Sequence, residues 1–237
     1  MHTGIANRHH HRRSAPFTET LVIYGVLLCL LWAPIPLGSN RLWAGGVLIV
    51  WIGVLFSLWG WVLLRRGWSD HQRPSLQAGL LLGGLLLLAQ AWVSAQILLD
   101  ISLHPGASVY RLLLALAYTM LFILVVGLFY TRRRLTLLLG GLVVAGTLQA
   151  FYAALSALTG SDWLTGNPGS SVATGTYINR SHLAGFLALT LSAGIGLLLA
   201  LRDGGSFSWK NLLELLLGPK TRIRVALVIM VIALVMT

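Results

Sequence analysis

Three residues suited to polar chemistry, Asn179, Arg180 and His182, lie within four positions of one another at the start of a long apolar run. A guanidinium matches a phosphate group through two parallel hydrogen bonds, and a helix N-terminus adds a partial positive charge and backbone N–H groups. We expect Asn179 to cap a helix, with Arg180 and His182 in its first turn. This turn is a candidate site for a phosphate or pyrophosphate. The alternative is a capped helix with an interfacial arginine, and a histidine at such a position is more often structural than catalytic.

The apolar runs that must position this turn are long enough to cross a membrane. Hydrophobic residues make up 57% of the 237 residues and charged residues 10%, and six runs reach the length of about 20 residues that a spanning helix needs. The sequence predicts an all-α, polytopic transmembrane bundle of about six to seven spans. The expected spans are 17–37, 42–64, 76–99, 110–130, 135–158 and 182–201, and a seventh begins near Arg224.

Two terminal features complete the expected domain organisation. Residues 1–16 form a basic tail without a cleavage site for a signal peptide, and residues 17–237 form one transmembrane domain. The seventh apolar run is still too short to cross the membrane when the chain stops at Thr237. We therefore expect this chain to be the front part of a longer protein, or a truncated one.

The basic residues alternate between the two sides of the expected bundle. Fourteen of the 17 Lys and Arg residues fall on one side, which the positive-inside rule places in the cytoplasm together with the N-terminus. The net charge of +11 then reflects topology, and nucleic acid is not an expected partner. Three arginines remain on the outer face: Arg41, Arg111 and Arg180. The positive-inside rule disfavours arginine on this face, so the presence of each needs another explanation.

Other polar and small residues have expected roles inside the bundle. Gln90 and Gln149 lie within apolar runs and should face the interior. Asp100, at the outer end of the third run, is the expected partner of an outer arginine. The pairs Gly79 with Gly83 and Gly141 with Ala145 have the four-residue spacing of small residues that lets helices approach closely. No motif for a metal or a phosphate-binding glycine loop is present, so we expect no metal and no cofactor.

Two stretches resemble a known family. The segment GTYINRSHLAGFLAL, residues 175–189, resembles the pattern G-T-[FY]-x-N-[RK]-[NS]-H-x-A-G-[FY]-L of the O-antigen ligase-like family, which contains bacterial O-antigen ligases and related polysaccharide polymerases. The segment PIPLGSNRLWA, residues 34–44, is similar to a P-L-P-x-G-S-N-R-x-W stretch near the start of many members. We call these the second and the first motif segment.

The resemblance implies a multi-pass membrane glycosyltransferase of the bacterial inner membrane. Such an enzyme transfers glycan from a polyprenyl (undecaprenyl) pyrophosphate at the periplasmic face to a hydroxyl of lipid A–core, in lipopolysaccharide biosynthesis, or of another glycan. The implied donor-binding residues are Arg180 with its neighbours Asn179 and His182, and Arg41; the supporting candidates are Asp100, Arg111 and Tyr177. The resemblance assigns no catalytic residue here, because the family's acceptor-activating His belongs to a later loop than any in this chain.

Two other function classes stay open at this point. A transporter for an anion or small solute would need charged groups paired at mid-depth in the helices, and the expected spans contain few ionisable residues there. The other class is an inactive, truncated scaffold subunit.

Overall fold

The computed structural model describes residues 17–39, 41–67, 72–160, 174–200 and 226–231. The basic tail and most of the expected seventh span lie outside these residues. The described part of the chain is built from helices and turns without a strand, which confirms the all-α prediction. The elements are α1 (Phe17–Trp32), the short 3-10 helix η1 (Leu37–Ser39), α2 (Leu42–Arg66), α3 (Gln72–Leu98), α4 (Pro105–Leu128), α5 (Arg132–Thr159) and α6 (Arg180–Ala200).

Five of these helices, α2 to α6, are long and apolar enough to cross a membrane. The boundary expected for the first span was wrong, because α1 ends at Trp32 rather than at residue 37 and has 16 residues. The reason is Pro34, since the residue before a proline is pushed out of the helical region. Residues 226–231 are helical, so part of the expected seventh run is confirmed as helix.

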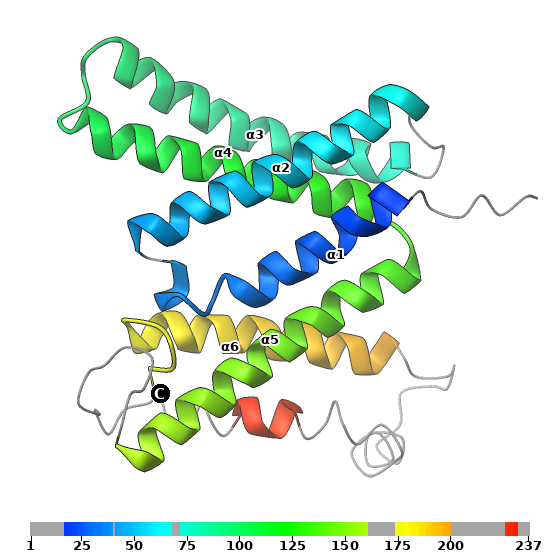
Figure 1. Ribbon diagram of the computed structural model, residues 1–237, viewed down its shortest axis with the longest axis vertical. Helices are drawn as coiled ribbons and strands as arrows, with labels where there is room; N and C mark the ends of the chain where they lie inside the picture. Colours follow the sequence, from blue (N-terminus) through cyan, green and yellow to red (C-terminus); the bar gives the residue numbers. More distant parts are fainter. Residues whose placement is uncertain (1–16, 40, 68–71, 161–173, 201–225, 232–237) are drawn as a thin grey trace, which may run out of the picture.

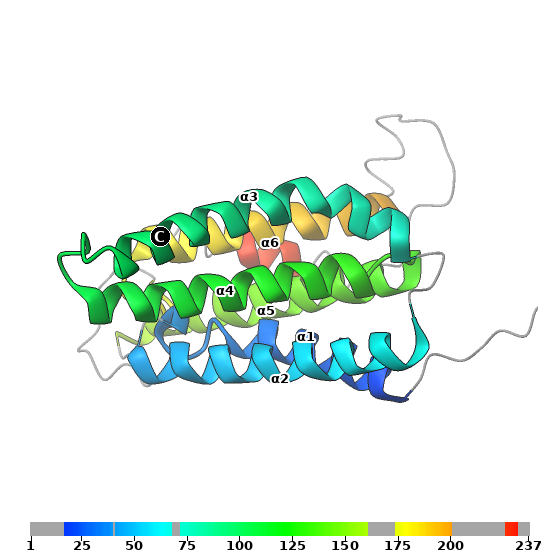
Figure 2. The same ribbon diagram turned by 90° about the horizontal axis from the view of Figure 1, so that it is seen from above.

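The six helices follow one another across the bundle in an order that differs from the chain order. α3 packs on α4, α4 on α2, α2 on α1, α1 on α5, and α5 on α6. Figure 1 shows the α3–α4 pair and the α5–α6 pair on either side of α1 and α2, and Figure 2 shows the helices running side by side along one direction. α1 and α2 therefore lie between two helix pairs, α3–α4 and α5–α6, that follow one another in the chain.

Small residues let these helices approach closely, as their spacing predicted. A Cβ added at Gly79 would lie 3.0 Å from the side chain of Val126 on α4, and one added at Gly141 would lie 3.2 Å from Leu27 on α1. In a bilayer the lipid is as apolar as the helix surface, so close van der Waals contact of this kind holds helices together.

The ends of the described helices lie at two ends of the bundle (Figures 1 and 2). We call the end where α2, α4 and α6 begin the motif end, and the end where α1, α3 and α5 begin the basic end. Arg41, Arg111 and Arg180 all lie at or near helix starts of the motif end, whereas Arg132, Arg133 and Arg134 begin α5 at the basic end. Within the part of the chain that the structure describes, the arginines therefore lie at the ends that the topology prediction expects.

An ion pair between Glu19 and Arg134 stabilises the basic end. Arg134 Nη1 donates to Glu19 Oε1 at 2.6 Å, and the side chains are 15% and 12% exposed. The same nitrogen donates to the carbonyl of Leu128 at 2.9 Å. The pair joins the first turn of α1 to the first turn of α5, a role that sequence reasoning missed when it counted Arg134 for topology alone.

The orientation of the bundle gives a first testable prediction. In a Cys29→Ser background, a cysteine at Ile178, which is 63% exposed at the motif end, should react with a membrane-impermeant maleimide applied from the non-cytoplasmic side. A cysteine at Thr131, exposed at the basic end, should react after the membrane is opened. The physical reason is the excess of arginine at the basic end. Labelling in the reverse order would refute the predicted orientation.

Candidate functional site

The two motif segments lie against each other at the motif end, although 142 positions separate their contacting residues. The hydroxyl of Thr176 lies 2.6 Å from the carbonyl oxygen of Pro34. The ring of Tyr177 covers Gly38, where an added Cβ would lie 2.6 Å from the ring. Gly38 also has φ of 61°, a backbone conformation that favours glycine. Both the contact and the backbone therefore require glycine at position 38.

Gln149 of α5 completes this contact from inside the bundle. Its Oε1 lies 2.9 Å from the Thr176 hydroxyl and accepts from the Thr176 backbone N–H at 3.4 Å. Gln149 is 4% exposed and Thr176 is 3% exposed. The prediction that Gln149 faces the interior is confirmed, and so is that for Gln90, whose Nε2 donates to Thr119 Oγ1 at 2.6 Å. Sequence reasoning missed Thr176. Its role becomes apparent only in the folded structure, where the buried amide of Gln149 on α5 lies against it.

The start of α6 is capped as predicted. Asn179 Oδ1 accepts from the backbone N–H of Ser181 at 2.9 Å, and the Asn179 carbonyl accepts from those of His182 and Leu183 at 3.1 and 3.4 Å. The N–H groups of Ser181 and His182, which would otherwise lack a partner at a helix start, are thus already bonded within the turn. An anion at this end would consequently depend on arginine side chains more than on the backbone N–H groups of the helix N-terminus.

Arg180 and His182 are both exposed, but they lie on different sides of α6. Residues two apart on an α-helix are separated by about 200° around its axis. Leu183 is fully buried, so Arg180 and His182 flank the buried face from opposite sides. The structure therefore separates the side chain of His182 from that of Arg180. This arrangement does not favour binding of one phosphate group by both side chains.

The other two outer arginines lie at the starts of neighbouring helices. Arg41 is the N-cap residue of α2, is exposed, and makes no capping hydrogen bond with its side chain. Arg111 is exposed in the second turn of α4. The adjacent Tyr110 places its hydroxyl against Gly45 in the first turn of α2, so the start of α4 packs on the start of α2. All three outer arginines thus present side chains at one end of the bundle.

Asp100 has a structural explanation that the sequence did not suggest. Its φ is 55°, the left-handed conformation. Its N–H donates to the carbonyl of Ile97, and the N–H of Ile101 donates to the carbonyl of Gln96. These two bonds form the Schellman motif that ends α3. Asp100 is exposed and forms no ion pair with any described residue, so the structure does not bring it against an outer arginine.

Tyr177 belongs to the second motif segment, and its ring packs on Gly38 of the first segment and on α6. Its ring is 5.9 Å from that of Phe186, and burial raises the pKa of its hydroxyl to about 12. The phenol therefore stays protonated at neutral pH, where it can donate a hydrogen bond but does not act as a base.

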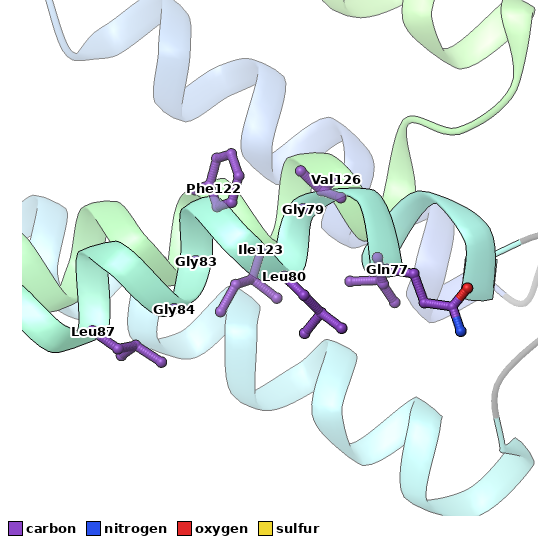
Figure 3. Close-up of a pocket in the computed structure, with 10 residues that line it drawn as sticks. Gln77, Gly79, Leu80, Gly83, Gly84, Leu87, Phe122, Ile123 and Val126 are labelled. Carbon is purple, nitrogen blue, oxygen red and sulfur yellow. The ribbon is translucent and has the colours of Figure 1, made fainter.

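A groove elsewhere in the bundle offers no comparable chemistry. It lies between α3 and α4 toward the basic end and has a volume of about 480 Å³ (Figure 3). Gln77 is the one side chain with a polar group among its lining residues, and the rest are glycines and apolar residues. Within the described residues, no three His, Cys, Asp or Glu side chains gather where they could hold a metal ion.

The fold and the charge distribution define a multi-pass helical membrane protein with three exposed arginines at one end of the bundle. Comparison with models of protein families, with curated proteins and with solved structures finds no match.

Proposed function

We propose that the protein is a membrane glycosyltransferase of the O-antigen ligase or polysaccharide polymerase type, in the bacterial inner membrane. It would transfer glycan from a polyprenyl pyrophosphate to an acceptor hydroxyl, either of lipid A–core or of another glycan, at the periplasmic face. The observation that supports this proposal best is the contact between the two motif segments, which carry Arg41 and Arg180. Both arginines are three residues from that contact, and three residues of backbone span at most about 11 Å.

Glycan transfer from a polyprenyl pyrophosphate requires fixed positive charge near the leaving group. In the transfer, the bond between the sugar's anomeric carbon and the phosphate oxygen breaks, and a bond from that carbon to the acceptor oxygen forms. The leaving polyprenyl pyrophosphate gains negative charge, which preorganised cations stabilise in a site of low dielectric. Arginine suits this task because it stays charged and offers paired donors to phosphate.

The distribution of polar groups favours this proposal over an anion transporter. The buried polar side chains deep in the described helices, Gln90, Thr119, Gln149 and Thr190, are neutral. A transporter would place ionisable groups at that depth. The exposed charges of the described residues lie instead near the helix ends.

Binding of the donor lipid tests the proposal. In nanodiscs containing the full chain, undecaprenyl pyrophosphate should bind at least about tenfold more tightly than undecaprenyl monophosphate, because a second phosphate adds charge-assisted hydrogen bonds worth about 1.5–3 kcal/mol. Radiolabelled lipid retained on the discs measures both affinities. Arg41→Ala should remove most of the preference, and Arg132→Ala, at the basic end, should leave it unchanged. Equal affinity for the two lipids in the unmodified protein would contradict the proposal.

A further inference from the structure

We infer that Gln149 and Thr176 are positioning residues that hold the two motif segments, which carry Arg41 and Arg180, in a fixed position relative to each other, here called their register. The functional consequence of this inference rests on the proposed function, whereas the geometry does not. Neither residue reaches an exposed surface, since both are buried, so they would act through the segments that they join and not on a ligand directly.

The Thr176 hydroxyl is the central group of this contact. It lies between the carbonyl oxygens of Pro34 and Gln149, at 2.6 and 2.9 Å, and its single proton can be donated to either. The Pro34 carbonyl also accepts from the N–H of Gly38 at 3.1 Å. Thr176 thus contacts the same carbonyl that closes the turn leading to η1, and through that turn it connects to the start of α2.

Three elements meet at this point. Pro34 follows α1, Gln149 belongs to α5, and Thr176 precedes α6. α1 and α5 already pack on each other, as do α5 and α6. The Thr176 hydroxyl therefore adds a hydrogen bond between segments whose helices are held independently, and its loss should shift the segments without dissociating the helices.

The positions of Arg41 and Arg180 make this register relevant to a diphosphate. Arg41 lies in the first motif segment and Arg180 in the second. A shift of one segment relative to the other therefore changes the separation of the two guanidinium groups. A ligand with two phosphates depends on that separation, whereas a ligand with one phosphate does not. Loss of the contact should consequently weaken pyrophosphate binding selectively.

The test compares Thr176→Val, which keeps the shape and removes the hydroxyl, with Thr176→Ser, which keeps the hydroxyl. The full chain is spin-labelled at cysteines placed at Leu42 and Ile178, 74% and 63% exposed, in a Cys29→Ser background. Pulsed electron paramagnetic resonance should give a narrow distance distribution for the parent and for Thr176→Ser, and a broader or shifted one for Thr176→Val. An unchanged distribution in Thr176→Val would overturn the inference.

Binding of soluble probes gives the second readout on the same variants without labels. Affinity for inorganic pyrophosphate should fall at least about fivefold in Thr176→Val, an effect of the size expected for one buried hydrogen bond. Affinity for inorganic phosphate should stay within twofold. An equal fall for both probes would show a merely structural role and refute the inference. If Thr176→Val does not insert, Gln149→Met carries the same test from α5.

The two readouts separate this inference from the proposed function. If the unmodified protein fails to bind pyrophosphate, the proposed function fails, and the distance measurement still decides whether Thr176 sets the register. If pyrophosphate binds and the Thr176→Val distances are unchanged, the inference fails while the proposed function stands.

Discussion

On the proposed function, replacing Arg180 with alanine, and separately with lysine, is expected to abolish glycan transfer while leaving membrane insertion intact. The guanidinium would stabilise charge that develops on the departing pyrophosphate, and removing one such donor lowers kcat by about 100- to 1,000-fold in other enzymes. Lysine should not restore activity, because a single ammonium does not reproduce the two parallel hydrogen bonds of arginine. The measurement is the rate of glycan transfer in vesicles supplied with the polyprenyl pyrophosphate donor.

A matched arginine at the opposite end provides the control for this experiment. Arg132 is exposed and begins α5 at the basic end, so Arg132→Ala removes the same charge far from the motif segments. Its transfer rate should equal that of the unmodified protein. Wild-type transfer by both Arg180 variants would refute the donor-site hypothesis. Because Arg180 is exposed, its loss should have little effect on folding, so the amount of inserted protein should match across all variants.

The largest effect on stability is expected for Gly146 in α5. An added Cβ there would lie 2.7 Å from Thr190 Cβ on α6 and 2.8 Å from the sulfur of Met230. Both neighbours are fully buried, so α6 and the helical residues 226–231 would have to move away. Forcing an extra methyl group into such packing costs about 1–3 kcal/mol. Gly146→Ala should therefore lower the melting temperature by about 3–10 °C for a chain of this size, and Gly146→Leu should prevent stable folding.

The control for Gly146 lies on the same helix. A Cβ added at Gly140 would meet no atom within 4 Å, so Gly140→Ala should leave stability unchanged or raise it slightly, because alanine favours a helix over glycine. The chain has one cysteine, Cys29, which is buried, and its reaction with a thiol-specific fluorophore during heating reports unfolding. Equal melting temperatures for Gly146→Ala and Gly140→Ala would contradict the packing argument.

The helices and the grouping of the charges were predictable from local sequence. Apolar runs of spanning length specify helices because backbone groups in lipid must bond within their own segment. The helix ends were less predictable: α4 begins at Pro105 instead of residue 110, and α5 at Arg132 instead of residue 135. Polar residues and proline fit the first turn of a helix, whereas the expected ends were read from apolar residues.

The candidate site was predictable in part. The sequence by itself determined the cap at Asn179, the burial of Gln149, and the three arginines on one side of the bundle, because caps and alternating spans depend on neighbouring residues in the chain. Two features were decided by tertiary structure alone: the hydrogen bonds of Thr176 and the ring of Tyr177 on Gly38. Both join residues that helix packing brings together from distant parts of the chain. The role of Asp100 in ending α3 is local, but it depends on a left-handed backbone conformation that residue type does not specify.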